Sequence, residues 1–168
     1  MHAADRLLAA VDRAEKTLAA VPQSRAQSAP APGQWSAVQV LGHLLDSAAN
    51  NHQRFVRASS QDDLVFAGYD QDHWVAAQDH ANARWPELLA LWAAYNRHLA
   101  RVMRAIPDAV RTRPHARHNF DDIGWQPPPA SEPATLDWLL HDYVGHLRHH
   151  LRQIDALLGT RADDPAAR

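Results

Sequence analysis

Histidines are the residues in this chain whose type and spacing could do chemistry. The chain has 12 of them in 168 residues, and neutral imidazole is the commonest metal ligand in proteins. His146 and His150 lie four residues apart in a segment of helical periodicity, so both rings can reach one ion. Measured around an ideal helix from Leu147, both lie on the same side of the apolar stripe, whereas His149 turns towards solvent. Such a pair also arises by chance on amphipathic helices, and it needs a third ligand.

A third ligand could come from the segment between residues 36 and 58, which offers two histidines. Helical projection favours His52, because it falls among leucines, a valine and an alanine. His43 shares a more polar face with Ser47 and Arg54. By the same pattern His52 could be a core or subunit-contact histidine and His43 an exposed side chain. The periodicity therefore leaves the choice open.

Four segments have the helical periodicity that would position these residues. They span about residues 4–21, 36–58, 85–106 and 135–158. Ser36 followed by Gln39 predicts a capping box at the start of the second segment, and Gly159 follows the last. Since we find no alternating strand pattern and no internal repeat, we predict an all-α fold, a four-helix bundle that forms one domain over residues 1–168.

The predicted connections differ in length and character. Residues 23–33 are rich in Ser, Pro and Ala and predict an exposed, poorly helical connection. Residues 59–84 form a loop too long for a simple hairpin, which could cross the bundle end or cover a pocket. Residues within this long loop could border such a pocket, with a short extra helix among them: Tyr69, Asp70, His73 and Trp74.

Composition narrows the classes of partner. The formal charge is −2, with 17 basic and 19 acidic residues scattered along the chain, so nucleic acid is a poor candidate. The basic stretch 111–118 is interpreted as a solvated connection in preference to an anion-binding lip. No run approaches the roughly 20 apolar residues of a membrane span. With no cysteine, the chain has no disulfide, thiolate zinc site or cysteine nucleophile, and we expect a cytoplasmic protein.

Several short motifs together resemble the DinB-like superfamily, in order and spacing from about residue 35 to residue 154. They are Trp35-Ser36, the stretch from Gly42 to Ser47, Tyr69-Asp70 with Trp74, and the stretch from Tyr143 to His150. The similarity is greatest to the subgroup of candidate metal-dependent hydrolases that includes bacillithiol transferases. The resemblance implies a four-helix bundle and a metal site with the ligands His43, His146 and His150. It thereby favours His43 over His52.

Three neutral imidazoles would leave an ion at least one open position, as in catalytic sites. Zinc is the first expectation, although nickel, iron, manganese and copper also accept three nitrogen ligands. Asp46 and Asp142 each lie one helical turn from a ligand and could orient an imidazole, or could simply be solvated acids. Gln153 is a further candidate for this supporting role, and members of the subgroup can carry another histidine at its position.

The resemblance and the open position together imply an enzyme. We expect transfer of a low-molecular-weight thiol, such as bacillithiol, onto an electrophile, or hydrolysis of a small substrate at the same ion. Thiol transfer is slightly favoured, because no carboxylate stands in a motif position as general base for water. The alternative is a non-catalytic stress-response protein that binds a metal or a small ligand. The resemblance also implies a homodimer.

Overall fold

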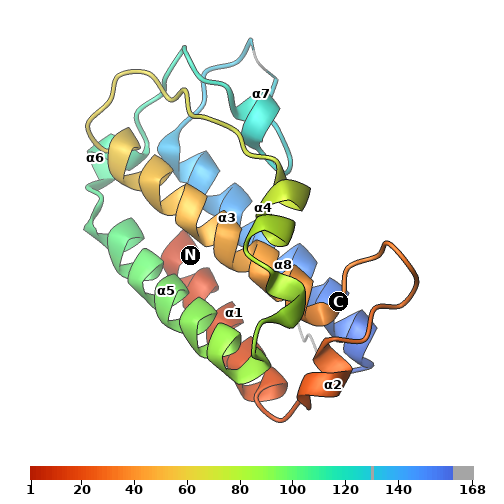
Figure 1. The fold of residues 1–168 in the computed structure, drawn as a ribbon. Coiled ribbons are helices and arrows are strands. Elements are labelled where there is room, and N and C mark those ends of the chain that lie inside the picture. The colour runs from red at the N-terminus through yellow and green to blue at the C-terminus, as the bar shows by residue number, and fades with distance from the viewer. Residues whose placement is uncertain (130, 161–168) are drawn as a thin grey trace.

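The computed structural model describes residues 1–129 and 131–160, and four long helices dominate it (Figure 1). They are α1 (Ala3–Leu18), α3 (Ala37–Ala58), α5 (Trp85–Ala105) and α8 (Leu136–Leu158). Shorter elements lie in the connections: α2 (Gln23–Ala26), α4 (Gln71–Ala77), the 3-10 helix η1 (His80–Asn82), α6 (Asp108–Arg111) and α7 (Phe120–Ile123).

The helix ends follow local chemistry. Gln39 accepts a hydrogen bond from the backbone N–H of Ser36 at 3.0 Å, which completes the capping box at the start of α3. Gly159 adopts a left-handed conformation with φ of 61° and closes α8. The first helix is shorter than predicted and ends at Leu18, and α2 follows Pro22 within the stretch that we expected to be poorly helical.

The four long helices form a closed bundle, because α1 and α3 each contact both α5 and α8. Asp5 near the start of α1 pairs with Arg104 near the end of α5. At the opposite end, the indole N–H of Trp85 donates to the carbonyl of Leu18 at 3.0 Å. These contacts make α1 and α5 antiparallel, and Figure 1 shows α3 running in the direction of α5 and α8 in the direction of α1.

The parallel arrangement of α3 and α5 explains the long connection between them. After α3 ends, the chain must travel back along the bundle before α5 can begin. The segment 59–84 does this along α3, and both α4 and η1 pack against that helix (Figure 1). The connection therefore covers one side of α3.

The two long connections contact each other at the end of the bundle where α3 finishes. Arg113 and Arg117 form ion pairs with Asp62 and Asp63, and buried His115 bonds to the carbonyl of Asp62 at 2.6 Å. The basic stretch 111–118 is thus docked on the other connection, although most of its residues are exposed, as the interpretation of a solvated connection predicts. Within residues 1–129 and 131–160, no helix combines the length and apolar character needed to cross a membrane.

Candidate metal centre

Three histidines from two helices converge in the bundle. His43 comes from α3, and His146 and His150 come from successive turns of α8. Their potential ligand atoms all lie within 4.8 Å of one another, and the Nε2 atoms of His43 and His146 are 3.3 Å apart. His43 is buried, whereas the other two are partly exposed. The structure therefore brings together the three residues that the resemblance implied as ligands.

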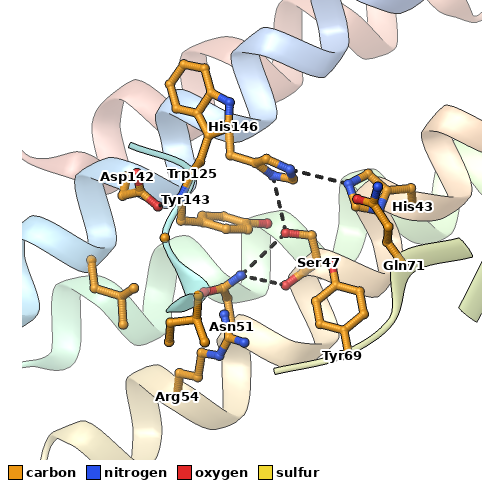
Figure 2. Close-up of a pocket in the computed structure, with 13 residues that line it drawn as sticks. His43, Ser47, Asn51, Arg54, Tyr69, Gln71, Trp125, Asp142, Tyr143 and His146 are labelled. Carbon is orange, nitrogen blue, oxygen red and sulfur yellow. Dashed lines mark hydrogen bonds between the residues drawn. The ribbon is translucent and has the colours of Figure 1, made fainter. Parts of the chain in front are cut away.

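Neighbouring groups determine which ring nitrogen faces the centre of the cluster. The side-chain oxygen of Gln153 lies 2.8 Å from Nδ1 of His150. Figure 2 shows the second contact, in which the hydroxyl of Ser47 lies 3.5 Å from Nδ1 of His146. A protonated Nδ1 that donates to Gln153 leaves the Nε2 lone pair of His150 free to bind. Gln153 thus makes the supporting contact that the sequence suggested for it.

Burial keeps the cluster uncharged. Burial, reinforced by neighbouring histidines, lowers the pKa of His43 to about 4 and that of His146 to about 3. The pKa of His150 is also lowered, again mainly by burial, although its contact with Gln153 opposes the shift. All three imidazoles are therefore neutral near pH 7, which is the form that binds a metal ion.

The donor set fits a divalent ion. In tetrahedral zinc sites, metal–nitrogen distances of about 2.0–2.1 Å put two ligand nitrogens roughly 3.3 Å apart. The Nε2 atoms of His43 and His146 have this separation. Two neutral rings that face each other through lone pairs at this distance need a proton or a cation between them. A third imidazole, from His150, beside the same point favours the cation.

In both α3 and α8 a glycine directly precedes the first proposed ligand. An aromatic ring packs where the side chain of each glycine would otherwise lie. A Cβ atom at Gly42 would stand 2.3 Å from the ring of His80, and one at Gly145 would stand 3.0 Å from the ring of Trp125. His80 and Trp125 come from the two long connections. The glycines therefore allow both connections to pack tightly beside the ligands.

The two aspartates have partners other than the ligand histidines, so neither takes the orienting role, one of the two that the sequence left open for them. Asp46 is buried and bonds to the side chains of Gln78, at 2.7 Å, and His80, at 3.1 Å. Among the described residues, Nδ1 of His43 has no hydrogen-bond partner. Asp46 therefore fixes the connection that carries α4 and η1 instead of orienting the ligand.

Asp142 anchors the second connection in the same way. Its two carboxylate oxygens accept hydrogen bonds from the backbone N–H groups of Trp125 and Gln126, both at 2.9 Å. This holds Trp125 over α8, where its ring also lies 5.4 Å from that of His149. His149 is exposed, as the helical projection predicts.

His52, the alternative third ligand, lies away from the cluster. Its Nδ1 lies 3.0 Å from the hydroxyl of Tyr95, and its ring centroid is 5.0 Å from that of His98, so it belongs to the contact between α3 and α5. The projection favoured His52 because it assumed a single buried face. In the bundle α3 has two helical neighbours, and His43 faces α8.

A pocket of about 340 Å³ opens beside His43 and His146. Its walls come from α3, α8, the start of α4 and the stretch after α7, and Figure 2 shows polar side chains of α3 reaching into it. Tyr69 lines it, as expected for the long loop, and burial raises the pKa of Tyr69 to about 12. Asp70, His73 and Trp74 are not among the lining residues. Asp70 instead caps α4, accepting from the N–H groups of residues 72 and 73.

Sequence reasoning missed three residues of this region, namely Arg54 as a pocket residue, His80 and Trp125. Arg54 is 6% exposed although its stretch of α3 reads as a polar face. The glycines at 42 and 145 were the available signal for His80 and Trp125, because a glycine inside a helix often marks a close approach. Only the folded chain shows which ring makes that approach.

Comparison with known proteins identifies the chain's relatives. Residues 6–154 match the sequence profile described as the DinB superfamily. YfiT of Bacillus subtilis, named as a candidate metal-dependent hydrolase, is 28% identical over 125 residues, which cover 74% of this chain and 65% of YfiT. A protein of Oceanobacillus iheyensis with the same description is 27% identical over 127 residues, covering 74% of this chain and 66% of the relative. The match thus spans slightly less than two thirds of either relative.

The solved structure of YfiT has the same fold. It superimposes with a TM-score of 0.74 at 23% sequence identity, over 92% of this chain and 83% of the YfiT chain. That structure is described as a four-helix bundle of unusual topology. The predicted all-α bundle and the predicted resemblance are both confirmed.

Proposed function

The chain belongs to the DinB superfamily, and from this premise we propose that it is a metal-dependent enzyme acting on a small molecule at the three-histidine cluster. The observation that carries the proposal is the meeting of three neutral imidazoles, two of which line a pocket. The names of the two relatives, candidate metal-dependent hydrolases, support it. His43, His146 and His150 would hold the ion.

The side chains have separable tasks in this proposal. A divalent cation bound by three neutral imidazoles lowers the pKa of a water or thiol beside it and so supplies a nucleophile near neutral pH. Gln153 holds the ring of His150 in the binding tautomer. Trp125 and Tyr69 form part of the pocket wall, where the neutral phenol of Tyr69 can donate a hydrogen bond to a substrate.

Transfer of a low-molecular-weight thiol is the reaction that we favour over hydrolysis. Hydrolysis gains from a free carboxylate as general base. The carboxylates one helical turn from a ligand are those of Asp46 and Asp142. Asp46 already accepts hydrogen bonds from His80 and Gln78, and Asp142 from two backbone N–H groups. A thiol has a lower pKa than water and needs less help from a base.

Metal analysis tests the proposal first. The purified protein should bind one equivalent of zinc, or of nickel, iron, manganese or copper, in calorimetric titration. His150→Ala should abolish tight binding, whereas His149→Ala, one residue away on the exposed face, should keep it. Equal retention in both variants would refute the ligand assignment. Thiol conjugation of a model electrophile, followed with bacillithiol or a simpler thiol, should then require the bound metal.

The alternative is a non-catalytic protein in which the ion joins α3 to α8. The position of the ligands on two helices that pack together supports it. The His146→Ala variant separates the two functions. A catalytic ion predicts a protein that stays helical and loses conjugation, whereas a structural ion predicts a large fall in melting temperature.

We also propose that the protein is a homodimer and that it is cytoplasmic. Light scattering tests the oligomeric state, and cell fractionation tests the location.

A further inference from the structure

A row of buried polar side chains on α3 leads away from the metal cluster. After His43 it continues with Ser47, Asn51 and Arg54, at steps of four, four and three residues, so all lie on one face of the helix. Each of the four is less than a tenth exposed, and all line the pocket (Figure 2). Buried polar rows of this kind need partners.

Arg54 is the charged member of this row, and it has few hydrogen-bond partners. Its guanidinium donates to the backbone carbonyl of Ala67 at 3.0 Å. That is its one hydrogen bond within the described part of the chain, and no carboxylate there lies within ion-pair distance of it. Burial lowers the pKa of Arg54, but a guanidinium remains protonated at any physiological pH. The nitrogen atoms of Arg54 that lack a partner are not among the fully buried ones, so their N–H donors can reach a group bound in the pocket.

The other charged side chain that lines the pocket does not neutralise Arg54. Asp142 is close enough to raise the pKa of Arg54 weakly, yet both of its oxygens already accept backbone hydrogen bonds. The remaining wall near Arg54 is neutral, with Asn51 and with Tyr69 held in its phenol form. Arg54 therefore faces the pocket as a cation that no carboxylate of the described residues contacts directly.

We propose that Arg54 binds a carboxylate of the substrate, and that the substrate carries this carboxylate at the end opposite its reactive thiol or scissile bond. The inference rests on the proposed function for the reactive end. Arg54 supplies a planar pair of N–H donors that matches a carboxylate. A single cation suits a monoanion better than a phosphate dianion, for which the described pocket wall offers no second fixed charge.

The spacing along α3 sets the shape of this substrate. Eleven residues separate His43 from Arg54, which corresponds to roughly 16 Å between their Cα atoms. The arginine side chain can shorten this gap, but one small group cannot contact both. The pocket volume of about 340 Å³ lies at the lower end of the range for ligand sites. The substrate is therefore slender and has its two functional groups at opposite ends.

Arg54 could instead serve only to hold the segment that contains Ala67. Two variants distinguish these roles. Arg54→Gln keeps a side-chain N–H for the carbonyl of Ala67 and loses the charge, whereas Arg54→Lys keeps the charge and loses the planar pair of donors. Arg57→Gln, on an exposed position of the same helix, is the matched control. Circular dichroism and metal titration of each variant establish that the bundle and the metal cluster remain intact.

The experiment uses thiols of increasing chain length to measure the distance between the metal cluster and Arg54. The cobalt(II)-loaded protein is titrated with ω-mercaptoalkanoates, from 3-mercaptopropionate to 8-mercaptooctanoate, and with ω-mercaptoalcohols of equal length. Binding is read from the cobalt–sulfur charge-transfer band. At one chain length the carboxylate should bind at least roughly tenfold more tightly than the alcohol. Arg54→Gln should remove this preference without weakening the alcohol, Arg54→Lys should keep part of it, and Arg57→Gln should keep all of it.

A second arm keeps this inference separate from the proposed function. If the protein binds no metal, hexanoate and hexanol are titrated into the metal-free protein and followed by amide chemical shifts. Tighter binding of hexanoate, lost in Arg54→Gln, supports the carboxylate site even though the proposed enzyme has failed. Where metal does bind, a wild type without a carboxylate preference at any length overturns the inference, and so does a preference that survives in Arg54→Gln.

Discussion

Single residues beside the ligands set how closely the chain can pack around the metal centre. Gly42 is the clearest case, because the ring of His80 occupies the space of a side chain there and reaches Asp46. The hydrogen bond between two buried polar side chains, His80 and Asp46, thus depends on the absence of a methyl group at residue 42. Burial also lowers the pKa of His43 and of His146 and keeps both rings neutral, so their protonation should make the stability of the protein depend on pH.

Gly42→Ala should destabilise the protein, although alanine is the better helix former. Its Cβ would stand 2.3 Å from the ring of His80, so the ring must move and its bond to Asp46 must stretch or break. We expect a loss of roughly 1–3 kcal/mol in the free energy of unfolding, measured by urea denaturation. Gly68→Ala is the control, because nothing lies within 4 Å of its added Cβ. A Gly42→Ala protein as stable as the control would contradict this packing.

The metal-free protein should lose stability on acidification. The pKa values of His43 and His146 are lowered to about 4 and about 3 in the folded protein, against about 6.5 in an unfolded chain. Between about pH 6.5 and pH 4 the unfolded chain therefore binds more protons, so the free energy of unfolding falls as the pH falls through this window. Above about pH 6.5 the full stability is present.

Urea midpoints of the metal-free protein between about pH 7 and pH 4.5 measure this effect. His146→Gln removes one of the titrating groups, so its midpoint should fall less steeply over the same range. An equally steep fall in both proteins would show that other groups, and not the cluster, dominate the acid sensitivity.

At the scale of elements, periodicity predicts the positions of the four long helices well, but it predicts poorly which helix faces are buried. The predicted ranges 36–58 and 135–158 differ by a residue at most from α3 and α8. A hydrophobic stripe says which face of a helix is buried in apolar contact, but it cannot show that a polar face is buried too. On α3 the face that contains Ser47 and Arg54 reads as solvent-exposed, and in the fold it lines a pocket.

The connections were harder to predict for a related reason. Their conformation depends on single contacts with distant parts of the chain, such as those of Asp46 with η1 and of Asp142 with the stretch after α7. No local pattern encodes these pairs. The motif resemblance supplied the choice of His43 over His52, which periodicity alone left open, but it gave no partner for either aspartate.

Asp142→Asn should loosen the second connection while leaving the bundle folded. An amide oxygen can replace one carboxylate oxygen, but its NH₂ group faces the second backbone N–H and cannot accept from it. We expect a local loss of roughly 1–2 kcal/mol, seen as faster hydrogen exchange at the amides of Trp125 and Gln126. Asp121→Asn, an exposed acid of the same connection, is the control. Unchanged protection in Asp142→Asn would contradict the anchoring role.

At the scale of the whole molecule, the four long helices form a closed bundle in which α3 packs against α8. An ion bound by the three histidines would connect these two helices. A ligand that binds only the folded state adds stability in proportion to the logarithm of its concentration. With the proposed ion, stability and metal occupancy would therefore be linked through the three histidines.

Adding zinc to the metal-free protein should raise its melting temperature. At free zinc about 100-fold above the dissociation constant, the gain is about 2.7 kcal/mol. His43→Ala should lose this gain. His52→Ala, which removes the other histidine that periodicity favoured on α3, should keep it. A gain that survives in His43→Ala and disappears in His52→Ala would move the metal site to the contact between α3 and α5.

The ligands His43 and His146 are 103 residues apart along the chain. A growing polypeptide on the ribosome exposes its first ligand long before the helix with the other two has been made. One imidazole alone holds a divalent ion weakly, so the proposed site would bind an ion tightly only after translation has passed His150 and α8 has docked. If the chain binds a metal as proposed, acquisition of that metal would be a late step in its maturation.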